Sequence, residues 1–457
     1  METFNEEHVQ AILHEHRLSI RGANNFFRDV WGPREKSMGN PWSPSNPNGT
    51  VILRLAENSL LHEEVSEFII SQMNVQPLEH LTYSTGPRGS RRLRRAAASF
   101  LTEAFHSREV ITADNIIVTP GLASAIDALS WAICNDGDGI LIPQPLYNGF
   151  NVDILNRSNA QVVGVTYEGI DGFSGLDDLF HPDITRIALE AALRRAKTEG
   201  IAVRALMPPE TLRVFASFCG VNGLHFISDE IYANSVFSNP AIPSPVPFTS
   251  VLALDLRGVI DPVLMHVLYG ASKDFCANGL RIGFACTKNE GIMGAMSSIG
   301  IFSWSPHVLQ DVWAAMLEET HWLADFMLQK TNLMADHYSI TTSFLSDNGI
   351  PFYETNAGLF IWVDLRHLLV STSSRQQSDY SALRATSPDA HIYKQRELRM
   401  ADICMENGVM IAPGHVYSPE EFGWFRITFT VRKDALEEGL KRLLLSIEDI
   451  RVESEWK

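Results

Sequence analysis

Residues 271–283 read Ala271-Ser272-Lys273-Asp274-Phe275-Cys276-Ala277-Asn278-Gly279-Leu280-Arg281-Ile282-Gly283, directly after an apolar run. That run, at residues 264–269, predicts a buried strand that ends just before the lysine. A lysine held away from water has a lowered pKa and becomes a nucleophile toward aldehydes. Arg281 lies eight residues beyond Lys273, and an arginine can hold a phosphate through two parallel hydrogen bonds. Taken singly, either residue is also explained as a solvated surface cation.

The chain upstream of this stretch alternates short apolar runs with amphipathic segments of helical length. Strands that alternate with helices in this way form a mostly parallel sheet with helices on both faces. We therefore expect an α/β fold with a large, mostly parallel sheet of the seven-stranded type, sandwiched by helices. The expected strands and helices of this part are strands 116–119, 139–142, 161–165, 203–207 and 224–228 and helices 124–134, 184–197 and 210–222.

The pattern changes after residue 305. A long periodic stretch from His307 toward Leu345 predicts a helix that bridges two domains. A smaller α+β domain should follow, with strands near 358–363, 409–411 and 424–429 and helices near 397–407 and 433–447. The expected division is an N-terminal segment over residues 1–51 that joins the small domain, a large domain over 52–310 and a small domain over 311–457.

Composition excludes several classes of function. The 457 residues are 45% hydrophobic and 20% charged, as in an ordinary soluble globular protein. The chain carries 37 Lys and Arg against 54 Asp and Glu, a net charge of −17, which is the wrong sign for nucleic acid or an anionic membrane surface. Its five cysteines lack metal or disulfide spacing, and its N-terminus lacks the pattern of a secretion signal. We expect a cytoplasmic protein without a bound metal.

Three further motifs lie at the ends of predicted strands, where ligands bind in open α/β sheets. Asp229 closes one strand, and Tyr232 follows three residues later. A glycine turn before Leu122 and Ala123 opens a helix, so their backbone N–H groups can hold an anion. Tyr147 follows another strand and can stack on a planar ring. Each motif alone is equally explained as a helix cap, an ordinary turn or a core aromatic.

The motifs occur in one order along the chain, and together they resemble the aspartate aminotransferase superfamily, the class I/II pyridoxal-phosphate enzymes of fold type I. The resemblance extends from Leu53 to about Leu444 and is most specific between Lys273 and Arg281. It is greatest for the branch that contains the 1-aminocyclopropane-1-carboxylate synthases. It implies pyridoxal 5'-phosphate as cofactor, an amino acid as the small-molecule substrate and a homodimer with sites at the subunit interface.

The resemblance also implies individual roles. Lys273 would bond the cofactor aldehyde and move the α-proton of the substrate, Asp229 would pair with the ring nitrogen, and Tyr232 would donate to the ring oxygen. The remaining implied cofactor contacts are Tyr147 stacked on the ring and Arg281, Ser272, Leu122 and Ala123 around the phosphate.

Two residues are implied at the substrate. Arg426 would clamp the α-carboxylate with a two-bonded fork, and its strand neighbours Phe425 and Ile427 point to the other face. A surface arginine is the simpler alternative. Tyr83 is our candidate for a residue that one subunit lends to its partner, with a core tyrosine as the alternative.

The chain departs from the family pattern in three places. An Asn-Pro-x-Asn-Pro-x-Gly segment, whose asparagine bonds the ring oxygen, is absent after Met207, where the chain continues Pro208-Pro209-Glu210. Gly270 stands where many relatives have a phosphate-binding serine. The ring-forming synthases carry a tyrosine near Tyr83, but one alignment puts Pro87 at its place, which weakens the ring-forming interpretation.

These observations favour an enzyme that acts at the α-carbon of an amino acid, with aminotransfer first and a role in secondary metabolism. One alternative is elimination, as in a carbon–sulfur lyase or a 1-aminocyclopropane-1-carboxylate synthase. Another, from a different class, is an impaired homologue that lacks the Asn-Pro segment and keeps the fold as a binding scaffold.

Overall fold

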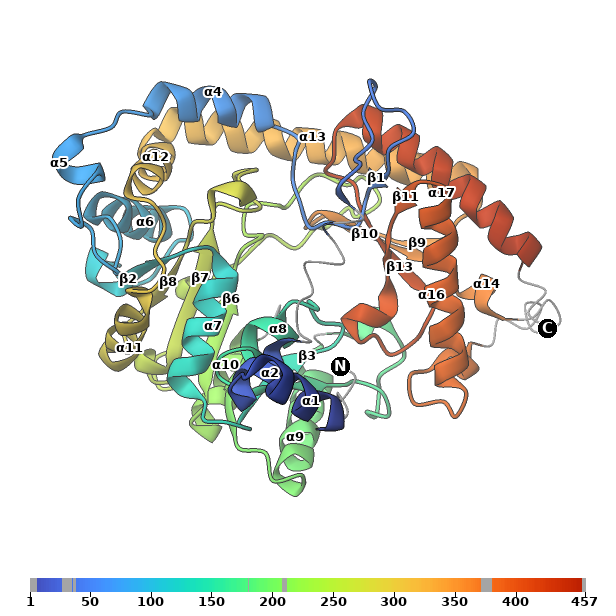
Figure 1. Cartoon of the computed structure of the whole chain (residues 1–457), viewed down its shortest axis with the longest axis horizontal. Coiled ribbons are helices and arrows are strands. Elements are labelled where there is room, and N and C mark those ends of the chain that lie inside the picture. The colour runs from blue at the N-terminus through green and yellow to red at the C-terminus, as the bar shows by residue number, and fades with distance from the viewer. Residues whose placement is uncertain are drawn as a thin grey trace.

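A seven-stranded sheet forms the centre of the larger part of the molecule (Figure 1). The computed structural model describes residues 6–26, 35, 38–179, 181–207, 212–370 and 380–453. Its strand order is β2-β8-β7-β6-β5-β3-β4, with β8 antiparallel to both neighbours and every other pair parallel. The strands are β2 (Ile116–Thr119), β3 (Gly139–Pro143), β4 (Gln161–Val165), β5 (Val203–Leu206), β6 (His225–Asp229), β7 (Met265–Gly270) and β8 (Gly283–Thr287).

The expected mostly parallel sheet of seven strands is thus confirmed. Sequence analysis missed one strand, β8, because Gly-Phe-Ala-Cys-Thr is short and contains few β-branched residues. The strands β2, β3 and β8 are buried along their whole length, as expected when helices cover both faces of a sheet.

Helices cover both faces of this sheet. Strand residues alternate between two apolar layers: Phe226 and Tyr269 belong to one core cluster, whereas Ile227 and Leu268 belong to the other. The first layer is closed by α6 (Arg91–Glu103), α9 (Pro182–Thr198), α10 (Leu212–Asn222) and α12 (His307–Glu318). The second is closed by α7 (Leu122–Ile133), α8 (Phe150–Leu155) and α11 (Glu290–Gly300). Two further helices, α4 (His62–Gln72) and α5 (Pro77–His80), lie beside α12 (Figure 1).

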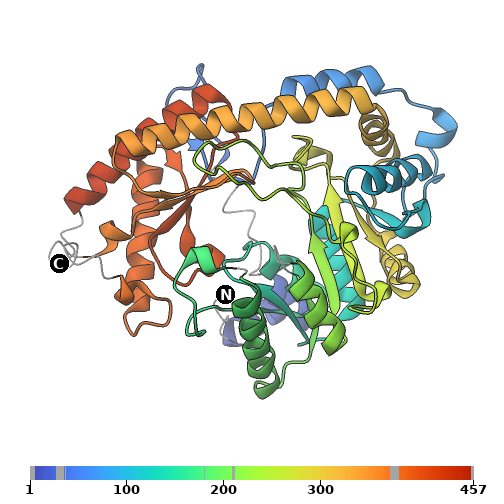
Figure 2. The same ribbon diagram turned by 180° about the vertical axis from the view of Figure 1, so that it is seen from behind.

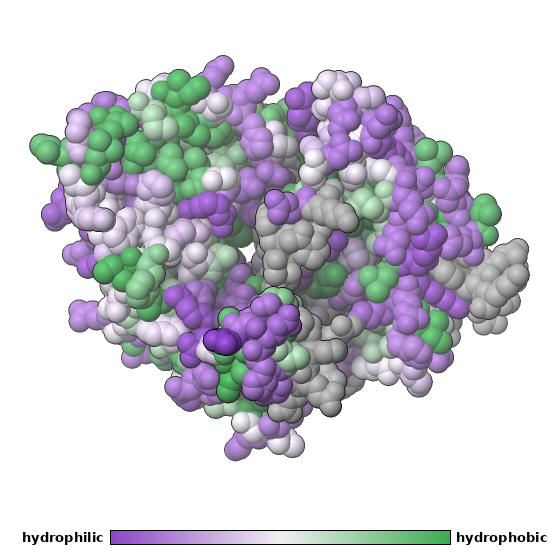
Figure 3. Space-filling model, viewed as in Figure 1, coloured by the Kyte–Doolittle hydropathy of each residue, from purple (hydrophilic) through white to green (hydrophobic). Residues whose placement is uncertain are grey.

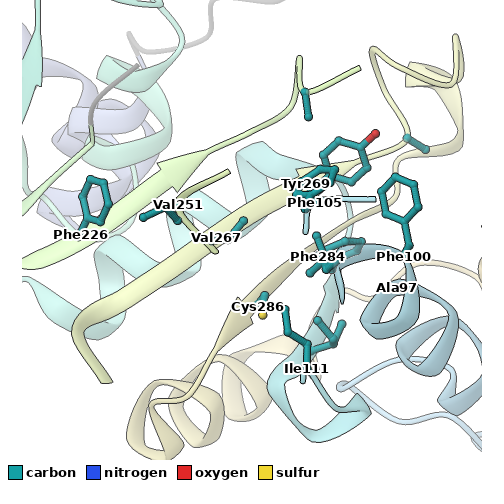
Figure 4. Packing of buried hydrophobic residues seen from close by; sticks show 14 of the residues in the cluster. Ala97, Phe100, Phe105, Ile111, Phe226, Val251, Val267, Tyr269, Phe284 and Cys286 are labelled. Atoms are coloured by element: carbon teal, nitrogen blue, oxygen red, sulfur yellow. The ribbon is translucent and has the colours of Figure 1, made fainter. Parts of the chain in front are cut away.

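A group of aromatic rings packs among the aliphatic side chains of the first layer (Figure 4). Tyr269 stacks on Phe100 with ring centroids 5.6 Å apart, and Phe105 meets Tyr269 edge-on at 5.1 Å. Phe284 stacks on Trp313 of α12 with centroids 5.5 Å apart, and both side chains are fully buried. These contacts fix α6 against β7, the strand that leads to Lys273, and α12 against the neighbouring β8.

The stretch from His307 toward Leu345, expected to be one bridging helix, forms two helices instead. The backbone of Glu319 leaves the helical region at φ −80° and ψ 73°, which ends α12 and starts α13 (Thr320–Asp347). The bridging role falls to α13, whose Phe326 packs in the core of the large sheet while Met334 packs in the core of the small one. Figure 2 shows α13 running across both parts of the molecule.

The smaller part is built on a four-stranded antiparallel sheet with its own core. Near the N-terminus, β1 (Val51–Ile52) pairs in parallel with β11 (Val409–Met410). The sheet has the order β12-β13-β10-β9, with β9 (Phe352–Tyr353), β10 (Phe360–Asp364), β12 (Ala412–Pro413) and β13 (Trp424–Thr428). Its helices are α14 (Arg366–Leu369), α16 (Ala390–Glu406) and α17 (Lys433–Glu453).

The first two helices, α1 (Glu6–His16) and α2 (Ile20–Phe26), lie in front of α8 in Figure 1. The side chain of Asn25 donates to the backbone oxygen of Asn156, at the end of α8, at 2.8 Å. All five cysteines are free, and none of the helices described is long and apolar enough to span a bilayer.

The aromatic layer sets a stability prediction. We expect Phe284→Ala to lower the free energy of unfolding by about 3–5 kcal/mol, because it removes a fully buried ring and leaves a cavity beside Trp313. Urea unfolding followed by tryptophan fluorescence measures the change. Val221→Ala is the control: Val221 is 82% exposed, so its loss should change the value by less than about 0.5 kcal/mol. Equal effects of the two substitutions would contradict the prediction.

Candidate active site

Two charged residues leave neighbouring parallel strands at the same edge of the large sheet. Asp229 is the last residue of β6 and pairs with Leu268 of β7, and Lys273 follows the end of β7 by three residues. The carboxyl ends of parallel strands meet at one edge, so the two side chains face the same space. Their charges interact: Asp229 raises the pKa of Lys273, and Lys273 lowers that of Asp229.

The amine of Lys273 lies in a largely buried position. Burial and, to a smaller extent, the positive charge of Arg426 lower its pKa to about 8, although the carboxylates of Glu57 and Asp229 act in the opposite direction. The amine donates a hydrogen bond to the backbone oxygen of Ala56. A lysine with this pKa is partly neutral at physiological pH, so it can act as a nucleophile.

Arg281 and the start of α7 form a cradle for an anion. Gly121 caps α7 at a φ of +83°, a conformation that favours glycine, and a Cβ there would lie 2.6 Å from Nη2 of Arg281. The guanidinium therefore lies against the first turn of α7, where the backbone N–H groups of Leu122 and Ala123 have no partner within the helix. Ser305 donates to the backbone oxygen of Arg281 at 2.9 Å.

Arg281 itself adopts a left-handed conformation at φ +53°, which is rare for residues other than glycine or asparagine. Its guanidinium is exposed and donates to the backbone oxygen of Asn278 at 2.9 Å. Such strain is typical of positions whose side chain must be placed for function. The buried Ser272 lies beside Lys273 in the same loop.

The absence of a serine at position 270 has a steric reason. A Cβ on Gly270 would lie 2.7 Å from the side chain of Leu122 and 3.0 Å from the backbone oxygen of Ile282. A serine there would have to displace both groups. In this chain the first turn of α7 occupies that space instead.

Two carboxyl groups of the site have raised pKa values. The protein around Asp229 desolvates its carboxyl and raises the pKa to about 6. Burial raises the pKa of Asp153, on α8, to about 7, and the negative charges of Asp127 and Asp229 contribute to this rise. The positive charge of Arg281 acts in the opposite direction, because it stabilises the ionised carboxylate. Sequence analysis missed Asp153. Its position one helical turn after Gly149 and Phe150 was the only signal available.

Aromatic side chains line the space between the two parts of the molecule. Tyr232 meets Phe360 of β10 edge-on with centroids 6.0 Å apart, and burial raises the pKa of its hydroxyl. The ring of Tyr147 lies so close over Gly149 that a Cβ there would be 2.2 Å from a ring carbon. Tyr147 is 49% exposed, so one part of the ring remains open to a ligand.

Arg426 projects from β13 into the same space. Its guanidinium carbon lies 3.9 Å from the ring centroid of Phe360 and 4.8 Å from that of Tyr417. Nη2 donates to the backbone oxygen of Arg54 at 2.6 Å, whereas the buried Nε has no hydrogen-bond partner among the residues that the structure describes. Burial lowers the pKa of this guanidinium. An unpaired buried donor beside a bound one suits a carboxylate ligand.

Residues 56–58, which precede α4, contact the loop that carries Lys273. Their role was not predicted from the sequence. Besides Ala56, this segment contains Asn58, which is fully buried and donates to the backbone oxygen of Lys273 at 3.4 Å. Glu57 accepts a hydrogen bond from the side chain of Asn278 at 3.0 Å. The segment is extended and irregular, so no helix or strand periodicity indicated its role.

Tyr83 stands apart from this group. It is 89% exposed, and its ring meets Trp304 edge-on with centroids 6.4 Å apart. The segment after Met207, where the family's asparagine is absent, is short: β5 ends at Leu206 and α10 begins at Leu212. Residues 208–211 of that connection lie outside the described residues.

The residues at this sheet edge fit pyridoxal phosphate. The glycine cradle of α7 with Arg281 suits a phosphate, a carboxyl at a strand end suits the ring nitrogen, and a lysine with a lowered pKa suits the aldehyde. Residues 50–443 match the family described as Aminotransferase class I and II. The chain belongs to this family.

Relatives support the assignment along nearly the whole chain. 1-Aminocyclopropane-1-carboxylate synthase 1 of Oryza sativa subsp. indica is 27% identical, over 96% of this chain and 88% of its own length. A probable aminotransferase of Aspergillus oryzae is 28% identical, over 93% of this chain and 97% of its own. The solved aspartate aminotransferase of Thermus thermophilus with maleate has a TM-score of 0.65 at 19% identity, covering 94% of this chain and 99% of that one.

Family membership confirms the expected enzyme and its cofactor, pyridoxal phosphate. The activity is that of an aminotransferase or of a synthase of the 1-aminocyclopropane-1-carboxylate type, and the impaired-homologue alternative is not favoured. An amino acid is the substrate class.

The lowered pKa of Lys273 predicts how cofactor attachment depends on pH. Only the neutral amine attacks an aldehyde, so the rate of attachment should rise with pH and level off above about 8. Stopped-flow absorbance after mixing apoprotein with pyridoxal phosphate measures this rate. Lys273→Ala should abolish attachment, and Lys288→Ala, at a surface ion pair with Glu109, should not change it. If the rate of attachment had its pH midpoint at about 10.4, the ordinary pKa of lysine, the prediction would be contradicted.

Proposed function

We propose that this chain is an aminotransferase in which Lys273 carries out the chemistry at the α-carbon of an amino acid. The observation that carries the proposal is the largely buried amine of Lys273, flanked by Asp229 and Arg281 at one sheet edge. Pyridoxal phosphate, when bound, supplies an aldehyde and an electron-withdrawing ring. Lys273 would hold that aldehyde, and its amine, when free, would move the proton at the α-carbon of the substrate.

The other residues of the site are proposed to hold and orient the cofactor. We assign Arg281, Ser272 and the backbone N–H groups of Leu122 and Ala123 to the phosphate. Asp229, when ionised, favours a proton on the ring nitrogen, because an opposite charge stabilises the protonated ring. In the same proposal Tyr232 donates to the ring oxygen, and Tyr147 stacks on the ring.

Arg426 is assigned to the α-carboxylate of the substrate. Its unpaired Nε and its Nη2 can together form a two-bonded fork with a carboxylate. Phe360 and Tyr417 exclude water from the guanidinium, which strengthens the ion pair. The substrate therefore spans the space between the small sheet, where it is bound, and Lys273, where it reacts.

Elimination is the second candidate, because the chain is similar to a plant 1-aminocyclopropane-1-carboxylate synthase as well as to a fungal aminotransferase. Both reactions begin with the removal of the α-proton by the same lysine. A carbon–sulfur lyase belongs to the same group of alternatives. A cytoplasmic location and a role in secondary metabolism stay predictions.

We also propose a homodimer, built on an apolar face over α4 and α5. Figure 3 shows apolar side chains gathered there, at the upper left. The largest exposed ones are Ile70, Leu78, Leu81 and Tyr83, with 73%, 85%, 73% and 89% of their surfaces open. A contiguous apolar face on a soluble chain indicates a protein partner. A second copy placed on this face would cover Tyr83, the residue proposed to reach the partner's site.

A hydrogen-bonded cluster holds this face in place. His80 Nε2 lies 3.2 Å from Asp311 Oδ2, and His307 Nε2 lies 3.5 Å from Asp311 Oδ1. These three residues are also close enough to bind a metal ion. However, the backbone N–H of Gln76 donates to His80 Nδ1 at 2.9 Å, so a neutral His80 carries its proton on Nε2 and has no lone pair there for a metal. The cluster therefore serves to fix α5 on α12.

The assay for the proposed function uses purified holoprotein with an amino donor and 2-oxoglutarate. Aminotransfer should yield glutamate, whereas elimination should yield pyruvate or oxobutyrate without an acceptor. Lys273→Ala should lower either rate by at least about 10³-fold, because it removes the group that moves the α-proton. Lys288→Ala is the matched control. A protein that binds cofactor but gives neither product with a panel of amino acids would contradict the proposal.

The proposed dimer predicts the effect of a charge on the apolar face. Leu78→Asp should convert the dimer to monomer, because it places a carboxylate in a desolvated interface. Light scattering coupled to gel filtration measures the mass. Val221→Asp, on the equally exposed surface of α10, should leave the dimer intact. A parent protein that is already monomeric would overturn the dimer.

A further inference from the structure

A buried ion pair involves the residue that follows the reactive lysine in the chain. Lys330 of α13 and Asp274 are both fully shielded from solvent, with 3.3 Å between Nζ and Oδ1. Lys330 also donates to the backbone oxygen of Asp274 at 3.0 Å. Because Asp274 is the next residue after Lys273, these bonds restrain the backbone that carries the reactive amine.

The carboxylate of Asp274 also binds the turn that follows β6. Oδ2 accepts from the backbone N–H of Asn234 at 2.9 Å, and Oδ1 accepts from the hydroxyl of Ser235 at 2.7 Å. These two residues closely follow Tyr232 in the chain. One carboxylate therefore ties the segment that carries Tyr232 to the segment that carries Lys273.

A further bond fixes the carboxylate to the sheet. The hydroxyl of Tyr269, on β7, donates to Asp274 Oδ2 at 2.9 Å, and this ring is itself fully buried in the aromatic layer. With these partners both carboxylate oxygens are satisfied, so the charge of Asp274 is well accommodated despite its burial. The network can therefore keep a fixed geometry.

Lys330 lies where α13 passes from one core to the other. Phe326, one turn before it, packs in the core of the large sheet, and Met334, one turn after it, packs in the core of the small sheet. Figure 1 shows α13 spanning the top of both parts. The ion pair therefore joins the helix that supports the small sheet to the loop of the reactive lysine.

Stability alone does not explain such a pair. Apolar residues of similar volume often stabilise a core as well as a buried ion pair does, because desolvation of two charges offsets their attraction. This pair bonds α13 to the loop of Lys273, and Asp274 is also bonded to the turn after β6 and to β7, so the pair fixes the relative positions of these segments.

We propose that Lys330 and Asp274 are positioning residues that hold Lys273 and Tyr232 in register with each other and with the interdomain helix α13. This rests on the proposed function, since Lys273 is the residue that reacts. Through α13 the same pair links Lys273 to the small sheet that carries Arg426. The guanidinium of Arg426, which is proposed to bind the substrate carboxylate, and the amine of Lys273 are thereby held at a fixed separation.

The test compares the parent protein with the double variant Asp274→Asn/Lys330→Met, in which no buried charge is left unpaired. Lys288→Met is the control, because it removes a lysine from a surface ion pair. In apoprotein, formaldehyde with cyanoborohydride labels neutral lysines, and peptide mass spectrometry reads the label on Lys273 as a function of pH. In holoprotein, kcat, KM and the circular dichroism of the cofactor band are measured.

We expect the double variant to fold and bind pyridoxal phosphate, with kcat lowered by about 10²-fold and KM changed by less than about threefold, as for a misplaced reactive group. The circular dichroism of the cofactor band should weaken. The pH midpoint for labelling Lys273 should rise from about 8 toward the ordinary lysine value of about 10.4, because a displaced amine regains water.

A double variant whose labelling midpoint, circular dichroism and kcat equal those of the parent would show a purely structural pair and overturn the inference. If the double variant does not fold, Lys330→Met and Asp274→Asn are labelled separately in the apoprotein, and unchanged midpoints in both would likewise overturn it. A parent protein that does not bind cofactor would instead refute the proposed function. The labelling midpoint needs no cofactor, so it still decides the inference in that case.

Discussion

The amine of Lys273 lies where three parts of the chain meet: the carboxyl edge of the large sheet, the irregular segment before α4 and the small sheet that carries Arg426. Burial at this junction is the main cause of the lowered pKa of the amine, about 8. Because of this lowered pKa, a part of the amine is neutral near neutral pH and can react with an aldehyde. Other contacts of the site keep this amine away from water and fix its position. Ala56 accepts its hydrogen bond, and Asn58 binds its backbone oxygen.

Charge at the site is balanced locally and not by the chain as a whole. The net charge of −17 suggests little affinity for anions, yet an anionic cofactor and a carboxylate substrate are both implied by the family. The cations proposed to bind them are Arg281, in a left-handed turn against α7, and Arg426, between two aromatic rings. The exposed Arg281 depends on its placement against the first turn of α7, whereas Arg426 depends also on the exclusion of water, because a solvated arginine binds anions weakly.

The departures from the family pattern have different physical standing. The absence of a serine at position 270 is accommodated, since the side chain of Leu122 fills that space. The absent asparagine after Met207 removes one donor to the ring oxygen, which leaves Tyr232 as the proposed donor there. Loss of one hydrogen bond to a charged oxygen is worth about 1.5–3 kcal/mol, which weakens a cofactor site without abolishing it. Similarity to both synthases and aminotransferases accords with a working enzyme.

Much of the fold was predictable, because hydrophobic periodicity and strand-end motifs are local properties of the sequence. The alternation from residue 116 to 270 predicted the parallel sheet, and β4 has the bounds expected. The break at Glu319 and the strand β8 were missed, because a single backbone dihedral and a short strand with few β-branched residues leave no periodic signal.

By itself the sequence determined the candidates for the site. Lys273, Asp229, Tyr232 and Arg426 follow or occupy predicted strands, and Arg281 lies eight residues after Lys273. Only the tertiary structure decided how reactive they are. The contributions of Asp153, Ala56 and the Lys330–Asp274 pair depend on contacts between segments distant in the chain. Desolvation and charge coupling arise from three-dimensional proximity, which no local pattern of residues encodes.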